Sequence, residues 1–256
     1  MNDSDLELAH ELADAASVIS LSYFRRDFKS WSKGDGSLAT EADEAVEDKV
    51  RALVHEKRAG DAVLGEERGQ TGSGRRRWIV DGIDGTIEFA AGTSDWGTLV
   101  ALEIDGRIDV AVCDQPAHRR RYWARRAGGA FRSNEPEGDA LRLRVSAARE
   151  LSAARVYIPP THWQPDEHAR QAAQRLAAAA IPAAPVDHPA LQLAAGGYDV
   201  VVFFLAGPWD LAAPSLIVEE AGGRFTDVAG HSDLTAGSAV FSNGPLHDEV
   251  VRLLRG

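Results

Sequence analysis

Apolar residues recur at helical spacing near the start of the chain. The positions are Leu8, Leu12, Ala16, Ile19 and Tyr23. Because they are three or four residues apart, the spacing predicts an amphipathic helix within residues 5–28. A second stripe of the same period predicts another helix after Thr40, a hydroxyl residue typical of a helix N-cap, with Asp43 in its first turn.

The middle of the chain changes to short apolar runs typical of strands. Asp105-Gly106 separates the runs 98–104 and 107–113, and this dipeptide is a strong signal for a two-residue hairpin turn. Alternation of apolar and polar residues predicts an edge strand or a half-buried strand at 141–145. Further strands are expected at residues 63–64, 78–81, 122–124 and 130–131.

Beyond residue 150, predicted strands and helices alternate. The strands are expected at 156–158, 200–205 and 239–241, and the helices at 166–179, 189–197 and 211–221. Such alternation is typical of α/β folds. The sequence therefore predicts an α+β part over residues 1–150 and an α/β part over residues 151–256.

The composition is that of a globular protein with enough length for a large core. The 256 residues carry 44% hydrophobic side chains and a formal net charge of −11, which excludes a nucleic-acid polymer as partner. A single cysteine, Cys113, excludes an internal disulfide framework and fits a reducing compartment. No apolar run is long enough to span a membrane, and the acidic N-terminus lacks signal-peptide features, so we expect no membrane partner and a cytoplasmic location.

The segment Asp81-Gly82-Ile83-Asp84-Gly85-Thr86 carries the strongest chemical signal. It follows the apolar run 78–80, which is expected to be the end of a buried strand. Two carboxylates in a tight glycine-containing loop are suitable ligands for Mg²⁺. Backbone N–H groups at Gly85-Thr86, where a helical turn begins, are suited to phosphate. The segment therefore predicts a metal-assisted phosphate site.

Two further segments place carboxylates where an element begins or ends. They are Glu66-Glu67 and Trp209-Asp210. Taken alone, Glu66-Glu67 is a solvated acidic pair, and Asp210 is the N-cap of a helix whose first turn contains Pro214. Their joint occurrence with the Asp81–Thr86 segment favours a shared metal site instead.

This joint pattern resembles the inositol monophosphatase superfamily of Mg²⁺-dependent phosphatases. The resemblance is carried by Ala39–Asp43, Gly65–Glu67, Asp81–Thr86, Trp209–Ala213 and Glu219–Gly223. Residues 60–67, 77–81, 120–124 and 243–249 are most similar to bacterial histidinol-phosphate phosphatases. The resemblance implies an α/β fold, a layered α-β-α-β-α sandwich with an α+β N-terminal half. It also implies a homodimer and a small phosphorylated substrate.

The same resemblance assigns roles to individual residues. It implies a first Mg²⁺ at Glu66, Asp81 and the carbonyl of Ile83, and a second at Asp81, Asp84 and Asp210. It allows a third, loosely held ion at Glu66.

Catalysis is assigned by the resemblance to Glu66, Thr86 and Asp43, with Thr86, oriented by Asp43, positioning the attacking water. The residues expected to face the substrate are Asp84, Gly85, Thr86, Asp187, Phe203 and Asp210.

The sequence departs from the family pattern at a few positions. Gly82 replaces a proline, which predicts weaker metal binding because glycine loses more backbone entropy on ordering. Phe203 stands where related enzymes have a Glu that binds substrate hydroxyl or amino groups. Asp187 partly replaces a Gly-[SD] element after a shift of one residue, and His188 is either a substrate contact or a loop histidine. The run Arg119–Arg121 is expected to be a solvated face.

The metal-binding residues match the family pattern, whereas the substrate-binding residues depart from it. The sequence therefore leaves several candidate substrates open. Histidinol phosphate ranks first, followed by inositol phosphates and by a sugar or nucleoside phosphate. Phe203 favours a less polar or differently shaped alcohol. A non-catalytic scaffold of the same fold is the alternative from a different functional class.

Overall fold

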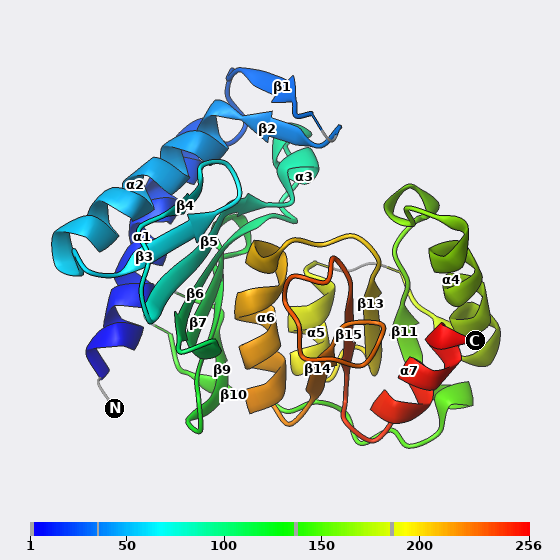
Figure 1. The fold of residues 1–256 in the computed structure, drawn as a ribbon. Coiled ribbons are helices and arrows are strands. Elements are labelled where there is room, and N and C mark those ends of the chain that lie inside the picture. Colours follow the sequence, from blue (N-terminus) through cyan, green and yellow to red (C-terminus); the bar gives the residue numbers. More distant parts are fainter. Residues whose placement is uncertain (1–2, 35, 136–137, 185–186) are drawn as a thin grey trace.

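Two large β-sheets and three pairs of helices alternate in five layers, in addition to one two-stranded sheet (Figure 1). The computed structural model describes residues 3–34, 36–135, 138–184 and 187–256. In the described part of the chain, no helix is both long and apolar enough to cross a membrane. The predicted layered α-β-α-β-α sandwich is confirmed.

The outer layer of the first half consists of α1 (Asp3–Tyr23) and α2 (Glu41–Lys57). Thr40 caps α2, because its side chain accepts hydrogen bonds from the first turn while the Asp43 carboxylate accepts from the Thr40 N–H at 2.9 Å. Apolar residues of both helices, including Leu12 and Val50, pack on the first sheet with exposures of 0%.

The first sheet contains eight strands in the order β10-β9-β8-β7-β6-β5-β3-β4. Their bounds are β3 Ala62–Gly65, β4 Gly69–Thr71, β5 Arg76–Asp84, β6 Gly97–Ile104, β7 Arg107–Gln115, β8 Arg120–Arg125, β9 Gly129–Ser133 and β10 Leu141–Arg142. Asp105 (φ 52°) and Gly106 (φ 77°) both adopt left-handed conformations between β6 and β7. The predicted hairpin is therefore confirmed, with the backbone geometry that two-residue hairpin turns favour.

An irregularity in β5 sets the geometry of the acidic loop. β5 pairs regularly with β6 as far as Asp81, and the register then shifts before Asp84. The Gly82 carbonyl accepts a hydrogen bond from Thr98 Oγ1 at 2.8 Å. A Cβ on Gly82 would lie 3.0 Å from the backbone oxygen of Asp43, so a glycine allows α2 to approach this loop closely.

The second sheet has the order β12-β11-β13-β15-β14. Its bounds are β11 Arg155–Tyr157, β12 Ile181–Pro182, β13 Val200–Phe203, β14 Arg224–Thr226 and β15 Ala239–Ser242. Helices α5 (Pro189–Ala194) and α6 (Pro208–Glu220) fill the layer between the sheets, and α4 (Glu167–Ala179) and α7 (His247–Arg255) cover the outer face. The site residues lie where α6 meets the first sheet.

Several expected boundaries are wrong. The predicted strand at 141–145 ends at Arg142, because the Val145 N–H bonds to the carbonyl of Ala221 at the end of α6 instead. The helix expected at 211–221 begins at Pro208, so Pro214 lies inside α6 rather than in its first turn. The helical turn expected to begin at Gly85-Thr86 is α3 (Thr86–Ala90). Elements that the sequence pattern missed are the hairpin of β1 (Ser30–Ser32) and β2 (Leu38–Thr40), the strands β4, β12 and β14, and the helix α7.

Candidate metal and phosphate site

Three carboxylates from distant segments converge between the two halves of the molecule. One carboxylate oxygen from each of Glu66, Asp81 and Asp210 lies within 4.8 Å of the other two. Glu66 follows β3, Asp81 lies near the end of β5, and Asp210 is the third residue of α6. Asp210 is therefore not the N-cap of α6; its carboxylate instead accepts the Gly207 N–H at 2.6 Å.

Burial of this much negative charge shifts the protonation of the group. Burial raises the pKa of Glu66 to about 7, although its hydrogen bond with Lys33 opposes the shift. Burial and the nearby charge of Asp84 raise the pKa of Asp210 to about 7, and the pKa of Asp81 is also well above its usual range. The buried carboxylates ionise unfavourably because no counter-charge among the described residues balances all three of them. A divalent cation such as Mg²⁺, which prefers hard oxygen ligands, would stabilise their charged form.

Asp84 lies beside this group rather than within it. Its side chain is 30% exposed, and burial with the charges of Glu88 and Asp187 raises its pKa to about 7. The Nε2 atom of His188 is 3.7 Å from the Asp84 Oδ2 atom. Asp84 therefore stands between the acidic group and the loop that precedes α5.

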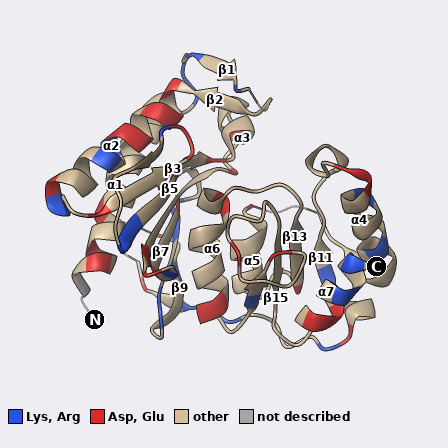
Figure 2. Ribbon diagram, in the orientation of Figure 1, with Lys and Arg blue, Asp and Glu red and all other residues tan. Residues whose placement is uncertain are grey.

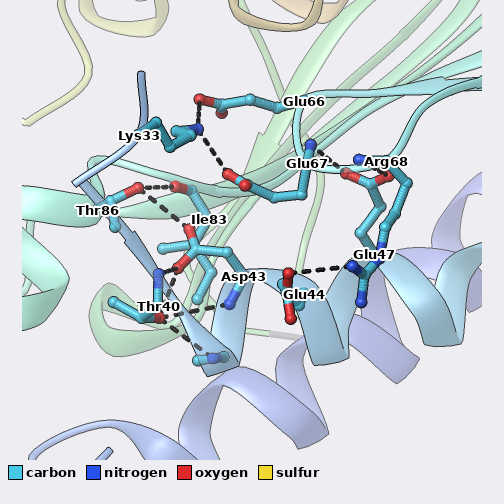
Figure 3. Close-up of polar contacts among 11 residues, drawn as sticks. Lys33, Thr40, Asp43, Glu44, Glu47, Glu66, Glu67, Arg68, Ile83 and Thr86 are labelled. Atoms are coloured by element: carbon cyan, nitrogen blue, oxygen red, sulfur yellow. Dashed lines mark hydrogen bonds and ion pairs between the residues drawn. The ribbon is translucent and has the colours of Figure 1, made fainter. Parts of the chain in front are cut away.

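Lys33 is the cation that meets the acidic group (Figure 3). Its Nζ atom lies 2.5 Å from Glu66 Oε1 and 2.7 Å from Glu67 Oε1. Burial lowers the pKa of Lys33, but hydrogen bonds with Glu66 and Glu67 outweigh that effect and raise the pKa. Lys33 lies between β1 and β2, and nothing in the sequence pattern indicated that it reaches Glu66.

Glu47 holds the loop that presents Glu66. The Glu47 carboxylate, with a side-chain exposure of 1%, accepts the backbone N–H groups of Glu67 at 2.8 Å and Arg68 at 3.0 Å. It also accepts from Arg51 Nε at 2.8 Å. A Cβ on Gly65 would overlap this carboxylate, which explains the glycine before the acidic pair. Figure 2 shows the concentration of acidic residues along α2, from which Glu47 comes.

Thr86 is oriented by two acceptors (Figure 3). Its Oγ1 atom lies 3.1 Å from Asp43 Oδ1 and 3.1 Å from the carbonyl oxygen of Ile83. Burial raises the pKa of Asp43, and hydrogen bonds from Thr40 and Thr86 oppose this shift. Gly85 precedes Thr86 with φ 84°, a left-handed conformation that glycine adopts readily.

Asp187 is enclosed by donors and faces inward. Its carboxylate accepts from Gln192 Nε2 at 3.0 Å, the N–H of His188 at 2.8 Å, and the side chains of Gln115 and Arg120. The side chain is 5% exposed, and its backbone is left-handed with φ 59°. The neighbouring Val186 lies outside the described residues.

The expectation of a solvated arginine face is wrong for Arg120 and Arg121. Arg120 pairs with Asp187, and Arg121, with 13% side-chain exposure, pairs with Asp114 at 2.7 Å. Arg119 is exposed as expected, at 68%. Asp187 is 67 positions from Arg120, and Asp114 is the cross-strand partner of Arg121 on β7, so the charge run alone gave no sign of either pairing.

Phe203 is the last residue of β13 and is half-buried. Its ring contacts those of Tyr157 (6.1 Å between centroids), His188 (6.5 Å) and Phe241 (5.9 Å), all edge to face. The position at which related enzymes were expected to carry a carboxylate is therefore part of an aromatic cluster. Through His188, this cluster is connected to Asp84.

Comparison with known proteins identifies the family. A model of the inositol monophosphatase family matches residues 1–255. The chain belongs to this family. Its membership agrees with the fold of the extragenic suppressor protein suhB from Bartonella henselae, which superimposes with a TM-score of 0.87 at 24% identity and covers 98% of both chains.

Among the relatives that match nearly the whole chain are two whose names state an activity. A Mycobacterium tuberculosis histidinol-phosphatase is 39% identical over 258 residues, which cover 99% of each chain. A Streptomyces griseus protein named glucose-1-phosphate thymidylyltransferase is 40% identical over 259 residues, covering 99% of this chain and 97% of the relative. With family membership and the histidinol-phosphatase relatives, the chain is a phosphatase, a phosphoric monoester hydrolase.

We expect Gly65→Ala to weaken Mg²⁺ binding, although it replaces none of the carboxylates of the acidic group. The added Cβ displaces the Glu47 carboxylate, which then no longer fixes the loop of Glu66. The buried hydrogen bonds lost predict a destabilisation of about 1–3 kcal/mol. Urea unfolding and Mg²⁺ titration measure both effects. Gly60→Ala is the matched control, because a Cβ there meets nothing within 4 Å. Equal behaviour of the two variants would contradict this role of Glu47.

Protonation of the acidic group predicts an unusual pH dependence of stability in EDTA. The pKa values of Glu66 and Asp210 are about 7 in the folded chain, against ordinary values of 4.5 and 3.8. The folded state therefore binds more protons than the unfolded state between these limits, and stability falls as pH rises from about 4 to about 7.

Thermal unfolding followed by circular dichroism tests this dependence. Added Mg²⁺ should raise the melting temperature more at pH 8 than at pH 5, because protons compete with the cation. The melting temperature of the Asp210→Asn variant should fall less steeply with rising pH in EDTA. A stabilisation by Mg²⁺ that is equal at both pH values would argue against the buried acidic group as its site.

Proposed function

We propose that this phosphatase is Mg²⁺-dependent and hydrolyses the phosphate monoester of a small alcohol, with histidinol phosphate as the first candidate. The observation that carries the proposal is the buried group of Glu66, Asp81 and Asp210 beside the Thr86–Asp43 pair. A cation site and an oriented hydroxyl are the two components that hydrolysis at phosphorus requires.

The metal ligands in this proposal are those implied by the family. Glu66, Asp81 and the Ile83 carbonyl would hold one Mg²⁺, and Asp81, Asp84 and Asp210 would hold a second; of these residues, Glu66, Asp81 and Asp210 form the group of carboxylates that lie together. Bound Mg²⁺ supplies charge neutralisation at the phosphoryl oxygens and lowers the pKa of water. The number of ions, including a third at Glu66, is part of the proposal.

The chain's own residues position the water and the phosphate. The Thr86 hydroxyl donates to Asp43 or to the Ile83 carbonyl, so its oxygen lone pairs can accept a hydrogen bond from the attacking water. Asp43 fixes this orientation because its other oxygen is held by Thr40 at 2.9 Å. The N–H groups of Gly85 and Thr86 are proposed to donate to the phosphate oxygens.

The ranking of substrates depends on relatives and on the substrate side of the site. Histidinol-phosphatases from Mycobacterium tuberculosis and Streptomyces coelicolor are 39% and 37% identical to the chain. Inositol-1-monophosphatase from Caulobacter vibrioides is 32% identical. This order supports histidinol phosphate over inositol phosphates, with sugar or nucleoside phosphates behind them. The non-catalytic alternative is disfavoured, because every carboxylate expected to bind a metal ion is present and Gly82 removes no ligand.

Asp84→Asn is expected to reduce Mg²⁺-dependent phosphate release by about 10²-fold or more, because one metal ligand loses its charge. The fold should persist, since the Asp84 side chain is 30% exposed. Asp248→Asn on α7, whose side chain is 78% exposed, is the matched control and should retain activity. Phosphate release from a panel of monoesters is measured with Mg²⁺ and with EDTA. Metal-independent turnover, or full activity in Asp84→Asn, would falsify the mechanism.

Thr86→Val retains the size of the side chain but removes the hydroxyl that faces Asp43. Loss of the hydroxyl that positions the attacking water predicts a decrease in kcat of about 10²-fold. The Mg²⁺ concentration that gives half-maximal activity should change little, because the Ile83 carbonyl and the acidic group are retained. Thr93→Val, which removes an exposed hydroxyl after α3, serves as the control. An unchanged kcat in Thr86→Val would assign water positioning to another group.

A further inference from the structure

We infer that His188, Phe203 and Tyr157 form an aromatic wall that receives the alcohol part of the substrate and selects alcohols carrying a flat, unsaturated ring. This inference rests on the proposed function, since it concerns the leaving group of the same hydrolysis. It assigns the specificity of the site to side chains that replace a hydrogen-bonding carboxylate with ring faces.

The aromatic wall borders Asp84, which lies beside the acidic group. His188 Nε2 is 3.7 Å from Asp84 Oδ2, and the His188 and Phe203 rings are 6.5 Å apart at an interplanar angle of 78°. The Tyr157 and Phe203 rings are 6.1 Å apart at 76°. A phosphoryl group held near Asp84 therefore has this wall as its neighbour on the side of the second sheet.

The backbone of the second sheet sets the position of these rings. Tyr157 ends β11 and Phe203 ends β13, and the two strands are parallel neighbours. Strands of the same direction bring their carboxyl ends to one edge of a sheet, where the site of an α/β layer is expected. Phe241 on β15 supports the Phe203 ring from behind at 5.9 Å and is itself fully buried.

The loop before α5 fixes the histidine of the wall. The buried Asp187 carboxylate accepts the N–H of His188 and is itself held by Arg120, Gln115 and Gln192. Asp187 is thus a positioning residue in this inference, because its oxygens are occupied by protein donors. Such preorganisation reduces the entropy cost of binding a rigid ring.

The chemistry of the wall distinguishes ring types. Aromatic side chains favour edge-to-face and offset contacts with flat rings. A polyhydroxylated ring would leave hydroxyl groups facing Phe203 without acceptors, which lowers its kcat/KM strongly. His188 Nε2 lies on the side of Asp84, 3.7 Å from its Oδ2 atom. The wall therefore offers one polar atom, at its edge beside Asp84, to a heteroaromatic ring such as imidazole.

The test uses four synthetic esters of graded ring character and one cyclitol ester. These are ethyl phosphate, 2-cyclohexylethyl phosphate, 2-phenylethyl phosphate, 2-(imidazol-4-yl)ethyl phosphate and myo-inositol 1-phosphate. The kcat/KM of each is measured at saturating Mg²⁺ and again in EDTA. Stacking of one ring predicts that the two flat-ring esters exceed ethyl phosphate by about tenfold or more. They should also exceed the cyclohexyl ester.

Variants at two adjacent phenylalanines separate the wall from general packing. Phe203→Leu should reduce the ratio of phenylethyl to ethyl phosphate toward one. Phe204→Leu is the matched control, because Phe204 packs among the buried residues of the outer helices and should retain the ratio. Phe203→Glu should raise the kcat/KM for myo-inositol 1-phosphate relative to 2-phenylethyl phosphate. His188→Leu should lower the kcat/KM for the imidazolyl ester relative to that for the phenyl ester.

The outcomes separate this inference from the proposed function. Equal kcat/KM for ethyl, cyclohexyl and phenyl esters, with hydrolysis still dependent on Mg²⁺, overturns the aromatic wall and leaves the proposed function standing. Equal changes of the ratio in Phe203→Leu and Phe204→Leu also overturn it. Absence of Mg²⁺-dependent hydrolysis of every ester overturns the proposed function and this inference together.

Discussion

Mutual repulsion among buried carboxylates is the constraint on which this structure depends. Glu66, Asp81 and Asp210 lie within 4.8 Å of one another, although each would be more stable in water when ionised. No single element could hold such a group, so it is assembled from a strand end, a loop and a helix start in both halves. The five-layer architecture holds the three carboxylates in place, because α6, which carries Asp210, is packed between two sheets.

Features decided by local chemistry could be predicted from the sequence. The Thr40–Asp43 cap and the Asp105-Gly106 turn each depend on residues a few positions apart, and both have the expected geometry. The acidic Asp81–Thr86 segment was identified for the same reason, although β5 continues with a register shift through Asp84 and does not end at Asp81. Short strands such as β4 escaped prediction because three residues carry no clear periodicity.

Contacts between distant residues could not be predicted from the pattern. Lys33 meets Glu66 across 33 positions, and Arg120 meets Asp187 across 67. Each of these side chains has an ordinary surface explanation when considered alone, and only the fold brings the partners together. The expected homodimer and the cytoplasmic location stay predictions, because a single chain tests neither.

The Asp43 carboxylate has consequences for how this sequence can diverge. One oxygen secures the start of α2 through Thr40, and the other orients Thr86. Helix initiation and the proposed positioning of water therefore share a single side chain, and a mutational scan would register one pleiotropic phenotype at this position. A lineage that abandoned catalysis would still be under selection to retain Asp43 for folding. The persistence of this residue in a homologue is accordingly weak proof of enzymatic activity.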